Sequence, residues 1–458
     1  MHSGKPLLTL PFGSNQNPLL QICDSPQRDY LAAYLLGAGA KTIVVEQNYF
    51  DRDYLDEFSA FYGKSSRGYS NICRRLHFFK SSFTHRKTNS AISGVDKSVK
   101  DLQGSYLGFV VLRPLNQAPF GRTVLAWYED KEQGSARVTP VLRTYTSNLL
   151  GIPLLVEGIP WQQQDRGVSA CATIALWSMF HSSAFDAHHA IPTTVEITQN
   201  AHNGSAGKRA FPSTGLNFLE LQEAILAQGL SPKLFAGDTF CEEKKPCFTK
   251  ALMASMCTAN IRSGYPVLLI GDYTHTQADQ GHAICCIGFR EEAQTPQEPG
   301  SYTTMDSETE LFYIHDDNVG ANVRCRLVEE NGVATLKSEP PAYIPEELAQ
   351  PQKQFKFKPS AMIIAVHEEI RKDAKTLIND GRLLAEITSD LLNKAYIKAG
   401  DEQPAIVFNS QFLDVRKFMG PFLEEALDND KTLLGQVRNS IATDIPPLCL
   451  HIGLLRIG

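Results

Sequence analysis

The chain has 458 residues, of which 43% are hydrophobic and 21% charged, with a net charge of −6 at pH 7. Chains of this length usually fold around more than one hydrophobic core, so two or three domains are expected. Lysine and arginine are scattered and form no basic stripe, which argues against a nucleic-acid partner. The apolar runs are too short to cross a bilayer, and the N-terminus lacks the apolar core of a signal peptide. We therefore expect a cytoplasmic protein with no membrane partner.

The ten cysteines are spread thinly over the chain and form no Cys-x-x-Cys pair. Without a secretion signal, reduced thiols are the expected state. Cys241 and Cys247 share one loop, but no second ligand pair follows at a zinc-site spacing. The sequence therefore predicts neither a metal site nor a cofactor.

Residues 1–150 are expected to form an N-terminal α/β region, because helical and strand-like segments alternate there. In chain order we expect a helix at 24–40, a strand at 41–47, a helix at 51–63, an exposed polar loop at 84–105, and strands at 106–114 and 122–129.

The first of these helices has clear local end signals. Asp24 or Ser25 is the expected N-cap, and Pro26 falls in the first turn. Gly37 or Gly39 is expected to end the helix. A nucleotide-binding glycine loop follows a strand and opens a helix, whereas here a helix ends and a strand begins, so these glycines are interpreted as a helix C-cap.

Residues 151–337 form the second predicted domain and carry the candidate chemistry. The polar lead "QQQDRGVSA" passes into the apolar, helix-compatible "CATIALWSMF" at Cys171. A thiol in the first turn of a helix sees free N–H groups and the positive end of the helix dipole, and both favour the thiolate. Cys171 is therefore a candidate nucleophile, with a small buried packing thiol as the alternative.

A histidine that opens a strand is the candidate base. The segments "YPVLLIGD" and "HAICCIGF" are expected strands joined by a polar loop, and His282 begins the second one. That position offers both rigidity and access to solvent, although a structural histidine is the alternative. His275 lies in the loop and is a weaker candidate, and His188 and His189 are expected at a surface turn.

Asp316 is the first acid after the expected strand "LFYIH", where a carboxylate can orient an imidazole. An ordinary Asx-type turn is the alternative. Asp317 beside it raises the question of a metal, but no histidine or carboxylate cluster nearby in the sequence completes a coordination sphere. Asp317 and Asn318 are the reserves for the orienting role.

The remaining residues divide into a linker and a C-terminal region. Residues 338–359 are rich in proline and polar side chains and are expected to be a linker. Residues 360–458 are expected to form a C-terminal α/β region. Its predicted elements are strands at 360–367, 404–408 and 448–457 and helices at 372–393 and 421–440.

The order of the middle segments resembles the papain-like cysteine peptidases, and most of all the bacteriocin-processing double-glycine peptidase domains of bacterial ABC exporters. That group has a glutamine-containing lead into a helix-starting cysteine and a glycine-led helical hairpin. A "G-x-P-V" strand, a strand opening "GH" and a strand ending "D-P-x-x-G" follow. This chain has, in that order, "QDRGVSACATIALWSM", "GLNFLELQEAILAQGLSPKLF", "GYPVLLI", "GHAICCIGF" and "FYIHDDNVG". The resemblance covers about residues 153–336 and leaves the flanking regions unrecognised.

The resemblance implies an α+β fold whose papain-like core packs the cysteine-bearing helix on an antiparallel sheet. It implies Cys171 as nucleophile, His282 as general base and Asp316 as orienting acid, with a glutamine of the lead as the oxyanion donor. Gln162, Gln163 and Gln164 are all available for that role, and Gln164 is the candidate.

The expected function is a cysteine-dependent amide-bond hydrolase, in the first instance a cytoplasmic bacterial peptidase acting on a protein or peptide through a thioester. The same residues could catalyse deamidation or acyl transfer. The rival from another class is a papain-like binding or regulatory module without activity, and a role in a bacterial defence or stress system is also compatible. Substrate and oligomeric state are not specified by the sequence.

Overall fold

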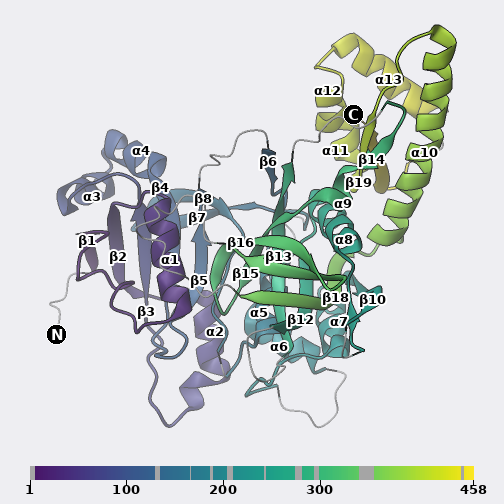
Figure 1. Ribbon diagram of the computed structural model, residues 1–458. Coiled ribbons are helices and arrows are strands. Elements are labelled where there is room, and N and C mark those ends of the chain that lie inside the picture. The colour runs from purple at the N-terminus through teal and green to yellow at the C-terminus, as the bar shows by residue number, and fades with distance from the viewer. Residues whose placement is uncertain are drawn as a thin grey trace.

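The computed structural model describes residues 6–128, 135–165, 167–185, 189–203, 210–241, 244–273, 281–292, 299–339, 355–444 and 448–457. An N-terminal sheet with its helices lies beside a central β-barrel, and a smaller sheet with a long helix lies on the other side of the barrel (Figure 1). None of the helices within these residues is long and apolar enough to span a bilayer.

The N-terminal sheet is antiparallel throughout, in the strand order β1-β2-β3-β4-β5. The prediction of an α/β region is therefore wrong in strand direction, and this part of the chain is α+β. Alternating helices and strands suggested parallel crossovers, but strand direction is set by pairing and not by local pattern. The strands are β1 (Leu7–Pro11), β2 (Thr42–Tyr49), β3 (Cys73–Phe79), β4 (Tyr106–Leu112) and β5 (Phe120–Leu125).

The helices of this region confirm one prediction and correct another. The first helix has the expected ends, because the Ser25 hydroxyl accepts the Arg28 N–H and Gly39 has a left-handed φ of 84° just past the helix. The predicted polar loop 84–105 instead forms two helices, held to the sheet by a few buried side chains such as Leu102. The elements are α1 (Pro26–Gly37), α2 (Arg52–Ala60), η1 (Tyr62–Lys64), α3 (His85–Ile92) and α4 (Asp96–Gly104).

The central sheet closes into a six-stranded barrel, because β18 pairs with both β17 and β12. All of its pairings are antiparallel. Two further strands extend it, β6 against β13 and β9 against β18. The strands are β6 (Ser135–Val138), β9 (Leu230–Ala236), β12 (Val267–Tyr273), β13 (Gly281–Glu292), β15 (Leu311–Asp316), β16 (Gly320–Glu330), β17 (Val333–Ser338) and β18 (Lys356–His367).

Helices α5 and α8 pack on this barrel. The expected helical hairpin at 215–235 is only half helical, since α7 is followed by strand β9. The helices are α5 (Cys171–Phe180), α6 (Thr194–Ala201), α7 (Phe218–Leu226) and α8 (Lys250–Arg262); the accessory strands are β7 (Arg143–Leu149), β8 (Ile152–Gly158), β10 (Thr239–Phe240) and β11 (Pro246–Cys247).

Two strands cross the expected domain boundaries. β18 begins in the predicted linker 338–359 and continues into the predicted region 360–458, yet it closes the barrel. β6 belongs to residues 1–150 but pairs with β13. The division at 150, 337 and 359 stays a prediction, whereas the hydrogen-bonded sheet is continuous across these positions.

The C-terminal sheet has the order β14-β19-β20, with one parallel and one antiparallel pairing. β14 comes from the polar insert after β13, so that insert ties the two sheets together. The long α10 runs along the outer side of this sheet (Figure 1). The elements are β14 (Tyr302–Thr304), α9 (Met305–Glu308), α10 (Ala374–Ala399), β19 (Ile406–Asp414), α11 (Val415–Lys417), η2 (Phe418–Phe422), α12 (Leu423–Ala426), α13 (Lys431–Asp444) and β20 (His451–Ile457).

Candidate active site

Cys171 is the first residue of α5, as the sequence predicts. Ala170 is the N-cap and provides no side-chain cap, so the first N–H groups of the helix have no side-chain acceptor from that position. Every other residue of α5 is buried, whereas Cys171 is only half-buried. The apolar helix therefore anchors itself in the core and leaves the thiol at its N-terminal, electropositive end.

His282 lies on β13, opposite Gly271 of β12. Its side chain is buried, and the ring of Tyr273 lies against it with centroids 4.7 Å apart. The Nε2 atom is 3.2 Å from Asp316 Oδ1 and 3.3 Å from Asp317 Oδ1. The Cys171 thiol is also close enough to the imidazole to contribute to the raised pKa of His282. The structure thus brings together the three residues that the resemblance implied.

The charge state of His282 follows from these neighbours. Burial by itself lowers the pKa of the imidazole, but the adjacent Asp317 and Asp316 carboxylates and the nearby Cys171 thiol outweigh it. The net effect raises the pKa of His282 well above its ordinary value. A protonated imidazole beside Cys171 can stabilise a thiolate and can later give up its proton.

Asp316 is held in place by more than the histidine. Its carboxylate accepts a short hydrogen bond from the Tyr273 hydroxyl and one from the Asn318 N–H at 2.9 Å. Its backbone carbonyl accepts the indole N–H of Trp161 at 2.9 Å. The carboxylate is thereby fixed against one ring nitrogen of His282, which leaves the other nitrogen for the thiol.

Asp317 is the second carboxylate on His282 and was only a reserve in the sequence interpretation. Burial, together with the neighbouring charge of Asp316, raises its pKa to about 7, although His282 pulls the other way. Its Oδ2 atom is buried without a hydrogen-bond partner. Near neutral pH this acid therefore changes charge directly beside the proposed base.

Gln164 and Asn318 contact each other: the Gln164 Nε2 donates to Asn318 Oδ1 at 2.9 Å. The other glutamines of the lead are engaged and buried, Gln162 with Glu57 and Gln163 with the N–H of Phe120. Gln164 is the one of the three that stays partly accessible. Asn318, a reserve for orienting the base, instead orients Gln164.

The expectation about metals needs a correction. We expected no metal because no histidine or carboxylate cluster near Asp316 and Asp317 in the sequence completes a coordination sphere. Folding nevertheless places His282 beside these two acids, with ligand atoms of the three residues within 4.8 Å of one another. These residues could hold a cation of the kind that accepts nitrogen and oxygen ligands. Without a metal, His282 Nε2 and the Asp316 carboxylate already have hydrogen-bond partners, since Nε2 faces Asp316 Oδ1 and that carboxylate also accepts from Tyr273 and the Asn318 N–H.

Of the other histidine candidates, the structure describes His189. His188 and His275 fall outside the described residues, and the His189 ring lies 5.6 Å from that of Phe185. A groove of about 1020 Å³ between α10 and β20, lined by residues such as Leu384 and Leu455, contains none of the proposed catalytic side chains.

Tyr273 is the residue of the site that sequence reasoning missed. It ends β12 and was interpreted as the first residue of a loop. Burial and the nearby Asp316 raise its pKa, so the hydroxyl stays protonated and donates to the carboxylate. Its place one residue past the predicted strand 265–272, which precedes the strand of His282, was the available signal.

A scan against models of known protein families finds no match to this chain, and a search of curated proteins finds no similar sequence. The site is therefore interpreted from its own geometry.

Proposed function

We propose that this protein is a cysteine-dependent amide-bond hydrolase that acts on a protein or peptide through Cys171, His282 and Asp316. The observation that carries the proposal is the position of the buried His282 imidazole between the helix-starting thiol and a carboxylate that is itself hydrogen-bonded. Nucleophile, base and orienting acid are in contact in that order.

In the proposed reaction the Cys171 thiolate attacks the amide carbonyl carbon and a C–S bond forms. N–H groups of the first turn of α5 and the Gln164 amide, once it leaves Asn318, are the candidate donors to the oxyanion. The C–N bond then breaks as His282 gives its proton to the leaving amine. Water, deprotonated by His282, attacks the thioester, so that a carboxylic acid leaves and the thiol is restored.

The first test compares alkylation of individual thiols. Cys23 and Cys449 are exposed and serve as internal references. We expect iodoacetamide to label Cys171 at least about tenfold faster than either reference near neutral pH, as an activated thiolate should be. Mass spectrometry of the tryptic peptides measures all three rates. A Cys171 rate no higher than those of the references would contradict the proposal.

The second test identifies the reaction. Wild-type and Cys171→Ala proteins are incubated with a cell extract, and new peptide termini are mapped. Termini produced only by the wild type support a peptidase. A mass gain of about one dalton at glutamine without new termini indicates deamidation by the same acyl chemistry, and joined peptides indicate acyl transfer. No difference between the two proteins would favour a non-catalytic binding or regulatory module.

A metal-binding module is the second candidate function, favoured by the convergence of His282, Asp316 and Asp317. Metal analysis of the purified protein separates the two. Stoichiometric metal that is lost in Asp317→Ala, together with slow labelling of Cys171, would favour it. A cytoplasmic location and a role in a bacterial defence or stress system, which a peptidase core between two flanking regions permits, are further proposals.

A further inference from the structure

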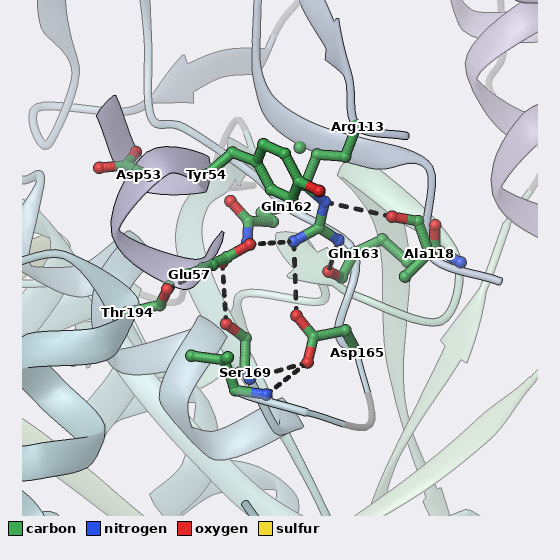
Figure 2. Close-up of polar contacts among 12 residues, drawn as sticks. Asp53, Tyr54, Glu57, Arg113, Ala118, Gln162, Gln163, Asp165, Ser169 and Thr194 are labelled. Carbon is green, nitrogen blue, oxygen red and sulfur yellow. Dashed lines mark hydrogen bonds and ion pairs between the residues drawn. The ribbon is translucent and has the colours of Figure 1, made fainter. Parts of the chain in front are cut away.

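A buried polar cluster of Glu57, Arg113 and Asp165, here named the Glu57 cluster, lies where α2 meets the loop before Cys171 (Figure 2). Glu57 is on α2, and Arg113 directly follows β4. The Arg113 Nη1 atom is 2.9 Å from Glu57 Oε2 and 3.6 Å from Asp165 Oδ2. The three side chains are at most 2% exposed.

The cluster binds the loop 162–169 through several of its residues. Glu57 Oε1 accepts the Gln162 amide at 2.7 Å and the Ser169 hydroxyl at 3.1 Å. Arg113 Nη2 donates to the Gln163 carbonyl at 2.9 Å. These contacts fix both ends of the loop that contains the proposed oxyanion donor, and Figure 2 shows them converging on one carboxylate and one guanidinium.

Asp165 holds the remainder of the loop. Its Oδ1 atom accepts the N–H groups of Gly167, Val168 and Ser169 at 2.7, 2.6 and 3.1 Å. A β-carbon on Gly167 would come within 2.6 Å of the Phe61 ring, so the loop also lies tightly against the residue that follows α2. The last of these fixed residues stands two positions before Cys171.

The turn that carries Asp316 and Asp317 is also in contact with the N-terminal region, through α1. Gln27 of α1 donates to the carbonyl of Asp317 at 3.1 Å. Gly320, which follows the acidic turn, packs directly on the Tyr30 ring of α1, and a β-carbon there would collide with it. Helices α1 and α2 thus contact the acid-bearing turn and the cysteine-bearing loop separately.

We propose that the Glu57 cluster is a positioning device that sets the geometry of Cys171 and Gln164, and that the N-terminal part of the chain is therefore an integral part of the active site. This inference rests on the proposed function. A buried charge cluster adds little net stability compared with packed apolar side chains, because desolvation offsets the attraction. The charges and hydrogen bonds of the cluster instead fix the orientation of the loop, because each donor of the loop has one fixed acceptor.

The experiment uses the full-length protein and a matched pair of variants. Ser169→Ala and Thr194→Val each remove one hydroxyl that donates to Glu57 Oε1, from 3.1 and 2.9 Å, but only Ser169 lies on the cysteine loop. Glu57→Gln removes the shared acceptor charge. For each protein we measure the melting temperature and the rate of Cys171 alkylation by iodoacetamide between pH 5 and pH 9.

We expect alkylation of Cys171 to slow about three- to tenfold in Ser169→Ala, on the scale of one lost ordinary hydrogen bond, and more in Glu57→Gln. Thr194→Val should label like the wild type at a similar melting temperature. Where a substrate is available, kcat should fall and KM change little, because the fully buried Glu57 is out of reach of a substrate.

Two results would overturn the positioning role: unchanged labelling in Ser169→Ala, or equal slowing in Ser169→Ala and Thr194→Val. Should Glu57→Gln fail to fold, the hydroxyl pair still decides. The proposed function fails differently, since Cys171 of the wild type would then label no faster than Cys23 or Cys449.

Discussion

Two adjacent acids with different surroundings set the behaviour of the proposed base. Asp316 accepts hydrogen bonds from Tyr273 and from the Asn318 N–H, so its carboxylate is solvated by the protein. Asp317 has a buried oxygen without a partner, and its pKa is raised to about 7. Asp316 is therefore the acid held in place to orient His282, whereas Asp317, with its raised pKa, gains its charge as the pH rises through about 7.

Asp317→Asn tests this difference. Above about pH 7 the ionised Asp317 helps to keep His282 protonated, so its removal should lower the pKa of His282. We expect the alkaline limb of kcat/KM, where the imidazolium is lost, to move down by about one pH unit, as expected for removing a charge within contact distance. Below pH 6 the wild-type Asp317 is already protonated, so the two profiles should converge there.

The measurement is kcat/KM against pH, with a direct NMR titration of His282 in parallel. An alkaline limb at the same pH in both proteins would show that the charge of Asp317 does not affect the pKa of His282.

The barrel strands determine where these side chains meet. β12 carries Tyr273 and pairs with both β13, which carries His282, and β18. Gly271 sits opposite His282 at this double pairing, and a β-carbon there would collide with the Lys358 carbonyl and lie 2.8 Å from Pro359 Cα. Backbone atoms cannot move aside easily, so glycine is what permits β18 to close the barrel beside the site.

Gly271→Ala should therefore force β12 and β18 apart. We expect the free energy of unfolding to fall by about 1–3 kcal/mol, as for other overpacked sites. Cys171 labelling should slow too, because Tyr273 and His282 shift together. Gly281→Ala is the matched control: Gly281 has no neighbour within 4 Å of an added β-carbon, so its effect should stay within about 0.5 kcal/mol. Denaturant titration measures both, and equal effects would contradict the argument.

Strands and helices from distant parts of the chain complete the central sheet and contact the proposed site. β6 and β18 complete the central sheet from outside residues 151–337, and α1 and α2 contact the two loops of the proposed site. One large core cluster runs from Phe12 through the barrel to Phe412. The predicted peptidase domain therefore depends structurally on both flanks.

A fragment of residues 151–337 tests this dependence. Without β6 and β18 it has unpaired edges on β12, β13 and β17 and exposes apolar surface that the full chain covers. We expect no cooperative thermal transition by circular dichroism and no selective labelling of Cys171, whereas the full chain shows both. A fragment that melts cooperatively would establish the predicted domain as an independent unit.

Local signals in the sequence predicted several elements and the candidate site residues. Ser25 and Pro26 mark the start of α1, and the change from polar to apolar residues at Cys171 marks the start of α5. His282 and Asp316 were found because each stands at the end of an apolar strand beside a polar loop. Such features depend on neighbours in the chain, where hydrophobic periodicity and capping preferences act.

Only the tertiary structure decided the direction of the N-terminal strands, the closure of the barrel by β18 and the second carboxylate on His282. It also brought Glu57 to Gln162, 105 residues away in the chain. The physical reason is the same in each case. Pairing and burial join residues that share no local pattern, and the free energy of such contacts depends on which surfaces meet after the chain has folded.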